Sequence, residues 1–276
     1  MLETTTTDVK GISPDKITQL ITIPVQNASV AAQVAQVIDT DATRTHIPLV
    51  TADPAAAWVA EGDEIGASAP TVDDIVVTPA KVAGLTIITN ELAADTSPAA
   101  QGIVGDGLSR DIARKIDAAF FGSKGASLVQ PAGLEDLTGV TDVDAGAAWA
   151  NLDPFAEAIS NAEGLGLTVD SFVANPADAL ILAKLKEAAS SNRPLLGADP
   201  ANPTKRTLQG VKLYVSPAVT VGTVWGVPQA RVFMVRRKNV DLQVDRSAYF
   251  TSDRTAIRAT MRVAFAFPHE AAIQKV

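Results

Sequence analysis

The stretch from Ile47 to Leu92 most constrains how this chain can fold. Two β-prone runs flank the turn-rich segment Gly66–Pro70, and acidic residues gather beside that segment. These acidic residues are Glu61, Asp63, Glu64, Asp73 and Asp74. The pattern predicts a long hairpin with a polar tip. Arms of about twenty residues have too little core of their own, because an isolated two-stranded ribbon is marginally stable in water. We therefore expect packing from outside the hairpin, and a neighbouring copy of the chain is one source.

Residues 1–46, which precede the hairpin, are polar and rich in Thr at first and then carry an Ala- and Val-rich run from Ser29 to Ile38. That run predicts one short helix in an otherwise extended arm. A segment that cannot bury itself usually lies on another domain or subunit, and a frayed terminus is the alternative. Met1–Lys10 lacks the basic and apolar regions of a signal peptide, and no apolar run approaches the ~18 residues of a membrane span.

A long amphipathic helix is predicted after the hairpin. Ser97 is a good N-cap, Pro98 suits the first helical position, and Gly122 is expected to end the helix in the left-handed conformation. Between these positions, apolar residues recur every four positions, as Val104, Leu108, Ile112, Ile116 and Phe120. Charged residues, among them Arg110 and Asp117, are expected on the surface of the helix. A helix of roughly 24 residues would be a rod of roughly 36 Å, which suits the spine of an elongated domain.

The next hundred residues predict a mixed helix and sheet unit. Asp153-Pro154 and Asn175-Pro176 each combine an N-cap residue with a proline at the first helical position, so a helix is expected to begin at each. Leu167–Ala174 and Val211–Val215 are predicted strands. The proline-containing segment between Ser190 and Arg206 is predicted to be a surface loop.

The final run alternates strictly between an apolar and a basic face. The apolar face comprises Thr255, Ile257, Ala259, Met261, Val263, Phe265 and Phe267, and the basic face comprises Arg254, Arg258 and Arg262. Asp241 and Asp245 on the preceding run predict a charge-balanced sheet, in which a neighbouring strand pairs with the arginines. A contact with another subunit and a contact with DNA are the alternatives.

Little in the sequence suggests catalysis. The chain has no Cys, which excludes thiolate chemistry. Its two histidines, His46 and His269, lie far apart in the sequence, which argues against a His-rich metal site. The acidic cluster does not match a calcium loop, and Gly102, Gly105 and Gly107 lie inside the predicted helix instead of at a phosphate-binding turn. A hydrolase that uses Glu61, Asp63 or Glu64 is the enzymatic alternative. The net charge of −8 should repel nucleic acid unless a local basic face overrides it.

From Ser29 to the C-terminus, an ordered series of motifs resembles the HK97-like bacteriophage major capsid family. The series runs Ile47-Pro48-Leu49-Val50, Ala57-Trp58-Val59-Ala60-Glu61-Gly62, Lys81-Val82-Ala83-Gly84-Leu85, Thr89-Asn90-Glu91-Leu92, Asp117-Ala118-Ala119-Phe120-Phe121-Gly122 and Pro131-Ala132-Gly133-Leu134. The resemblance implies an α+β, HK97-like capsid fold. Its parts would be an N-terminal arm (1–46), an extended loop (47–92), a peripheral domain with the spine helix (93–130 and 236–276) and an axial domain (131–235).

The resemblance also implies a function. In this family the extended loop lies over an adjacent subunit and the axial domains meet at symmetry axes. The chain would therefore be a virion capsid protein that self-assembles, in the host bacterial cytoplasm, into pentamers and hexamers of an icosahedral shell around double-stranded DNA. It would bind that DNA without sequence specificity. Further partners would be scaffolding, portal and decoration proteins, with no membrane, metal or cofactor. The candidate inter-subunit contacts are Trp58, Glu61, Lys81 and Arg110.

The resemblance leaves two questions open: whether the shell is a phage capsid or an encapsulin, and whether it needs a scaffold. Encapsulins, bacterial nanocompartment shells that enclose cargo enzymes, share the fold and are the nearest rival. The stretched arm before Ile38 favours the phage capsid. About 46 residues precede the extended loop, so we expect either a separate scaffolding protein, no scaffold or an already matured chain, and Met1 argues against the last. The segment Gly66–Asp74 contains no Lys, which argues against covalent cross-linking.

Overall fold

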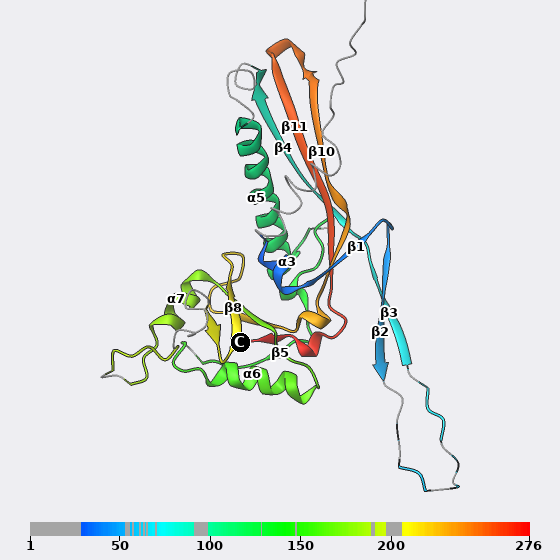
Figure 1. Ribbon diagram of the computed structural model, residues 1–276, viewed down its shortest axis with the longest axis vertical. Helices are drawn as coiled ribbons and strands as arrows, with labels where there is room; N and C mark the ends of the chain where they lie inside the picture. The colour runs from blue at the N-terminus through cyan, green and yellow to red at the C-terminus, as the bar shows by residue number, and fades with distance from the viewer. Residues whose placement is uncertain are drawn as a thin grey trace, which may run out of the picture.

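The computed structural model is an elongated molecule with two sheets and a projecting ribbon (Figure 1). It describes residues 29–52, 56, 58–60, 62, 64, 66–69, 71–90, 99–127, 129–146, 148–188, 191–196 and 206–276. A long helix, α5, lies along a four-stranded sheet in the upper half, and a six-stranded sheet with two helices forms the lower half. The chain therefore has two layered bodies and an extension that belongs to neither.

The four-stranded sheet has the order β1 (Gln36–Thr40), β10 (Phe233–Tyr249), β11 (Arg254–Ala266), β4 (Ala80–Thr89). Strand β1 is parallel to β10, and the other pairs are antiparallel. The predicted apolar face of the final run is confirmed, because each of its seven side chains is at most 9% exposed. This face packs against α5 and forms the larger hydrophobic core.

Helix α5 spans Ala99–Phe121, so the predicted helix is confirmed within the described residues; Ser97 and Pro98 lie outside them. Leu108, Ile112, Ile116 and Phe120 are buried on its sheet-facing stripe. The prediction that Gly122 adopts a left-handed conformation is wrong, because Gly122 is not among the glycines with positive φ. Its N–H donates to the Ala118 carbonyl at 3.1 Å, and a Cβ at this position would lie 2.7 Å from the same oxygen.

The six-stranded sheet is built from short strands that come from distant parts of the chain. Its order is β5 (Thr141–Asp142), β12 (Gln274–Lys275), β9 (Val224–Val227), β6 (Ser171–Ala174), β8 (Val211–Val215), β7 (Thr207–Leu208). Strand β8 has the predicted bounds, whereas β6 covers only the second half of Leu167–Ala174. The division into domains remains a prediction, but the pairing of β12 with β5 and β9 attaches the end of the chain to this sheet.

Helices α6 (Asp153–Gly164) and α7 (Pro176–Lys184) begin at the two predicted Pro-containing sites. Asn175 is the N-cap of α7 as predicted, because its side chain accepts a hydrogen bond from the Ala177 N–H. The N-cap of α6 is Leu152, so the prediction that Asp153 is the cap is wrong; Asp153 lies in the first turn. A second core under α6 contains the neighbouring rings of Phe155 and Phe172, whose centroids are 5.5 Å apart.

The projecting ribbon consists of β2 (Thr45–Ala52) and β3 (Thr71–Val77), which pair antiparallel from Thr45↔Val77 to Ala52↔Thr71. Its base is anchored on the four-stranded sheet, on the face opposite α5, where Ile47 and Val77 join Val235, Ala264 and Ala266 in a third small core. The predicted hairpin is thus confirmed, but its return arm does not continue to Leu92. Residues after the ribbon enter β4 and pair with β11 instead.

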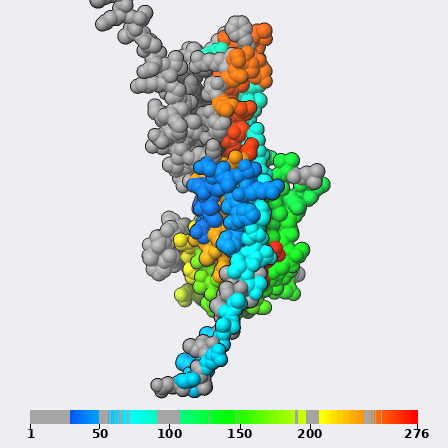
Figure 2. All heavy atoms as spheres, turned by 90° about the vertical axis from the view of Figure 1, so that its right-hand side faces the viewer, coloured from blue at the N-terminus to red at the C-terminus, as the bar shows by residue number. Residues whose placement is uncertain are grey.

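The segment before the ribbon crosses the middle of the molecule (Figure 2). The Ala/Val run from Ser29 to Ile38 does not form one helix throughout: it contains α3 (Val30–Val34) and then β1. Residues 1–28 of the predicted arm lie outside the described residues. Ala31, Val34 and Ala35 are buried, which means that this segment is part of the main core.

Candidate assembly interface

The ribbon and the loop beyond it expose large apolar side chains. Trp58 is fully exposed, and Val72 and Val76 are 59% and 49% exposed. A single exposed apolar residue is ordinary, but these three lie on an extension that leaves the molecular body (Figure 1). The described part of the loop thus presents apolar surface that its own chain does not cover.

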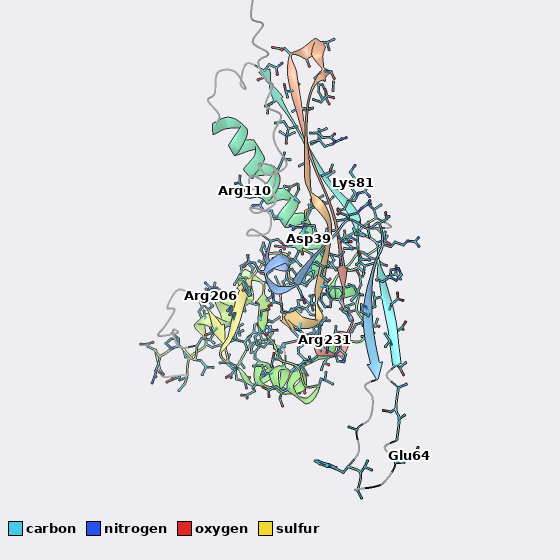
Figure 3. The ribbon with its side chains drawn as sticks, turned by 45° about the vertical axis from the view of Figure 1, so that its right-hand side comes forward. Asp39, Glu64, Lys81, Arg110, Arg206 and Arg231 are labelled. Atoms are coloured by element: carbon cyan, nitrogen blue, oxygen red, sulfur yellow. The ribbon has the colours of Figure 1, made fainter. Side chains whose placement is uncertain are left out.

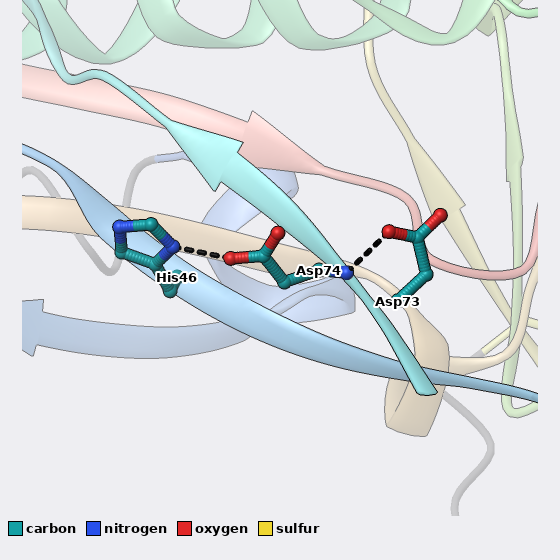
Figure 4. Close-up of polar contacts among 3 residues, drawn as sticks. All are labelled: His46, Asp73 and Asp74. Carbon is teal, nitrogen blue, oxygen red and sulfur yellow. Dashed lines mark hydrogen bonds and ion pairs between the residues drawn. The ribbon is translucent and has the colours of Figure 1, made fainter. Parts of the chain in front are cut away.

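One face of the ribbon combines this apolar surface with charge. Val72, Asp74 and Val76 alternate onto the same face of β3, because side chains of a strand alternate between its two sides. The Asp74 carboxylate contacts Nδ1 of His46 on β2, and the Asp73 carboxylate accepts a hydrogen bond from the Asp74 N–H at 2.8 Å (Figure 4). His46 and Asp74 remain half exposed or more. The contact of His46 with Asp74 therefore joins the two strands of the ribbon.

The face of the four-stranded sheet that points away from α5 is basic. Residues that pair across strands share a face, and the register places Lys81, Arg262 and Arg237 in one row across β4, β11 and β10. Arg258 and Arg254 continue the same face along β11. We call these five residues the basic face. Arg237 is half-buried and the other four are exposed.

Two aspartates lie on this face as well. Asp241 and Asp245 are directly opposite Thr260 and Ala256 and so share the face of the arginines, as the prediction of a charge-balanced sheet requires. They are diagonal neighbours of the arginines, because the register places Gln243 directly opposite Arg258. The Asp245 carboxylate instead accepts hydrogen bonds from the Ser247 N–H and hydroxyl, which lower its pKa. Among the side chains that the structure describes, no cation of the basic face forms an ion pair with a carboxylate. Leu85 and Ile87 on β4 add exposed apolar surface beside these cations.

A buried carboxylate joins the N-terminal segment to α5. Asp117 was expected on the surface, but it is only 6% exposed. One of its oxygens accepts hydrogen bonds from the Ser29 hydroxyl at 2.6 Å and the Ala31 N–H at 3.0 Å, and the other from the Val30 N–H at 3.1 Å. Burial raises the pKa of Asp117, and these hydrogen bonds partly oppose that rise.

A second charged contact fixes the same segment. Nε and Nη2 of Arg236 donate to the two carboxylate oxygens of Asp39 at 2.6 and 2.8 Å. Only 6% of the Arg236 side chain is exposed, and its Nη1 is buried without a hydrogen-bond partner. Together with Asp117, this pair holds α3 and β1 against the helix and sheet.

The four candidate contact residues do not form one cluster. Trp58 lies on the projecting loop, Lys81 on the outer face of β4 and Arg110 on the exposed side of α5, across the sheet from Lys81 (Figure 3). Glu61 lies outside the described residues. Such dispersal is expected of a subunit that meets several neighbours, whereas an active site needs its groups to converge. Alternation predicted the arginines of this face, whereas the addition of Lys81 and Arg237 to it and the burial of Asp117 were missed, because each depends on pairing between distant segments.

The described residues contain no group of three or more His, Asp or Glu side chains that could hold a metal ion. Within the same residues, no helix has the length and hydropathy that crossing a membrane would require.

These features are those of a structural subunit. The protein-family model described as "Phage capsid family" matches residues 11–276. The chain therefore belongs to the phage capsid family. It is a capsid shell protein of a phage-type particle, not an enzyme, and its place is the capsid of the virion within a multi-subunit shell.

Solved structures place the fold. A structure from Mycobacterium phage Bobi has a TM-score of 0.70 at 19% identity and covers 100% of this chain and 95% of its own. The structure described as "Capsid of native GTA particle computed with C5 symmetry" has a TM-score of 0.69 at 17% identity, with coverage of 100% and 94%. One from Microbacterium phage Oxtober96 has a TM-score of 0.68 at 20% identity, with coverage of 87% and 84%. The fold is HK97-like, as predicted. No curated protein sequence matched the chain.

Proposed function

We propose that this chain is the major capsid protein of a tailed bacteriophage, and that it assembles into pentamers and hexamers of an icosahedral head. The observation that carries the proposal is the ribbon, which leaves the body with Trp58, Val72 and Val76 exposed. Such surface is stabilised when a partner covers it, and in the family this chain resembles the partner is the adjacent subunit. Repeating one contact around closed symmetry adds many modest interface energies into a stable shell.

The proposal also assigns parts and partners. The arm, the loop, and the peripheral and axial domains would have the predicted boundaries, and the axial domains would meet at the five- and six-fold axes. Leu180 and Ile181 on α7 and Val221 nearby are exposed apolar residues of that axial part. The shell would enclose double-stranded DNA without sequence-specific contacts, would form in the host cytoplasm, and would use scaffolding, portal and decoration proteins.

Expression of the chain alone tests the proposal, with negative-stain electron microscopy and mass photometry of the product. Closed shells, or free pentamers and hexamers, are the expected result. A monomer whose ribbon resists protease would count against it, because the ribbon would then need no neighbour. Nucleic acid recovered from shells formed during phage infection would support a genome container, and protein cargo without nucleic acid would support an encapsulin-type compartment.

A further inference from the structure

Arg236 is a buried cation on the apolar side of the four-stranded sheet. Residues directly opposite each other in neighbouring strands share a face, so the pair Arg236↔Val263 places Arg236 on the side that packs against α5. Nε and Nη2 donate to Asp39 and form one edge of the planar guanidinium, so Nη1 points away from Asp39. Nη1 is buried and has no hydrogen-bond partner among the described residues. Such a buried donor is expected to have an acceptor, because leaving it unsatisfied is costly.

A small cavity adjoins Arg236, between the sheet, α5 and α3. The volume open to the centre of a water molecule is about 10 Å³, close to the ~10–15 Å³ that a single buried water needs. Two of its lining residues are polar, Arg236 and Ser29. The apolar lining residues come one each from α3, β1, α5, β10 and β11, and they are Ala32, Val37, Ile116, Met234 and Met261.

The Ser29 hydroxyl, the second polar group of the cavity, can accept one more hydrogen bond. Its hydrogen is donated to Asp117 at 2.6 Å, and its oxygen accepts the Ala32 N–H at 3.2 Å. A hydroxyl oxygen has two lone pairs, so one acceptor position remains. The cavity therefore offers a donor, Nη1 of Arg236, on the side of the sheet and an acceptor, Oγ of Ser29, on the side of the helices.

We propose that this cavity is the binding site of one structural water molecule, which accepts a hydrogen bond from Nη1 of Arg236 and donates one to Oγ of Ser29. Buried waters bridge polar groups that have no other partner, and two such groups are enough to hold one. The water completes a chain of hydrogen bonds from Asp39 through Arg236 and Ser29 to Asp117. The two charged contacts that hold α3 and β1 in place thereby act as one network.

The pattern of donors and acceptors favours water over an anion such as chloride. The charge of Arg236 is already balanced by the Asp39 carboxylate. An anion also has no hydrogen to donate to Ser29, whose own hydrogen is used by Asp117. Water accepts on one side and donates on the other, so it satisfies both groups.

Crystal structures of the full-length chain, at a resolution that shows ordered water, test the site directly. Crystals are grown once in chloride and once in bromide. We expect a density peak about 2.7–3.2 Å from both Nη1 of Arg236 and Oγ of Ser29, without the anomalous signal of bromide. A cavity without a peak would overturn the proposal, and a bromide signal would replace the water with an anion.

A double-mutant cycle tests whether the water couples the two charged contacts. Arg236→Met removes Nη1, and the Asp39 carboxylate stays solvated because 64% of its side chain is exposed. Ser29→Ala removes the acceptor. Since either substitution already breaks the bridge, the effects of the two on the unfolding equilibrium constant should fall short of additivity by about threefold or more, measured by urea denaturation.

A second buried serine supplies the matched control. Ser216 is fully buried and its hydroxyl accepts the Ala218 N–H at 3.3 Å, but it does not line the cavity. The effects of Ser216→Ala and Arg236→Met should therefore add. Additive effects of Ser29→Ala and Arg236→Met would overturn the bridge even if the cavity holds a water. If a variant does not fold, the density of the wild-type chain still decides whether the site exists.

Discussion

At the scale of single residues, Asp117 is the most consequential side chain that lies outside the predicted interface. It accepts hydrogen bonds from Ser29, Val30 and Ala31, so Asp117→Ala would leave two buried donors and one partly buried donor without this acceptor. We expect a loss of about 1–3 kcal/mol in the free energy of unfolding, measured by urea denaturation of the monomer. Asp111→Ala removes an exposed carboxylate from the same helix and should change stability by less than about 0.5 kcal/mol. Equal losses in the two variants would contradict the role of Asp117 in joining the N-terminal segment to α5.

The raised pKa of Asp117 predicts the pH dependence of this contact. In the unfolded chain the pKa of Asp117 is near 3.8. In the folded protein Asp117 keeps its proton to a higher pH, because burial disfavours the charged carboxylate. Stability from this group is therefore complete below the unfolded pKa and is lost as the pH rises through the folded pKa. The stability of the wild type relative to Asp117→Asn should fall as the pH is raised from about 3 to 7. A relative stability that increases over this range would contradict the direction of the shift.

Two glycines near α5 should respond to alanine in opposite ways. A Cβ at Gly133 would lie 2.1 Å from the Gly122 carbonyl oxygen and 2.3 Å from that of Ala119, so Gly133→Ala forces the loop off the end of the helix. We expect a loss of about 1–3 kcal/mol from this overpacking. Gly107→Ala lies inside the helix, has open space around it and should gain up to about 1 kcal/mol. Thermal unfolding of the monomers compares them, and a loss in both would refute the steric argument.

Residues whose environment depends on a local pattern could be predicted, whereas residues whose partners lie far away in the sequence could not. The stripe Leu108, Ile112, Ile116 on α5 is a local pattern, and periodicity alone predicted it. Asp117 has a local pattern as well, that of an exposed charge, but its partner Ser29 lies 88 positions away. Gly122 looks like a left-handed stop by the same local rule, although close contact with the helix explains it. The error at Asp117 thus comes from a contact of long sequence separation, whereas Gly122 contacts the carbonyl of Ala118 only four positions earlier.

At the scale of elements, strands and helices with a strong period were predicted, whereas their partners were not. The apolar face of β11 and the bounds of β8 follow from alternation. The departure of β4 from the hairpin does not, because a strand with alternating side chains pairs equally well with either neighbour until its register is fixed by a core. That core includes Ile47 and Val77, which end the ribbon at its base. Alternation also predicted the arginines on the opposite face of β11, but not that Lys81 of β4 and Arg237 of β10 lie in the same row, because that depends on the register between strands.

The packing of α5 on this sheet gives a prediction at the same scale. Leu108 contacts the sheet where β4 has Gly84, and a Cβ there would lie 2.9 Å from the Leu108 side chain. Leu108→Ala should therefore leave a cavity between helix and sheet and cost about 2–5 kcal/mol. Arg110→Ala on the exposed side of the helix should cost less than about 0.5 kcal/mol. Urea denaturation measures both; a small effect of Leu108→Ala would mean that α5 contributes little to the stability of the sheet.

At the scale of the whole molecule, we expect the loop of the ribbon to be needed for assembly but not for the folding of the monomer. Ala52 and Thr71 are paired at the end of the described ladder, so an Asn-Gly turn can replace residues 53–70 and close the hairpin there. The base of the ribbon keeps Ile47 and Val77 in their core, and the monomer should unfold within a few degrees of the wild type. Assembly should be lost, because the replacement removes Trp58 and the acidic residues Asp53, Glu61, Asp63 and Glu64.

A second variant distinguishes reach from chemistry. A Gly/Ser loop of the original length in place of residues 53–70 keeps the span of the ribbon but none of its side chains. If the contact depends on charge and apolar surface, this variant should fail to assemble as completely as the short one. If it assembles, the loop acts only as a tether and the paired strands β2 and β3 carry the contact. Normal assembly of the short variant would mean that neither loop length nor loop chemistry holds neighbouring subunits together.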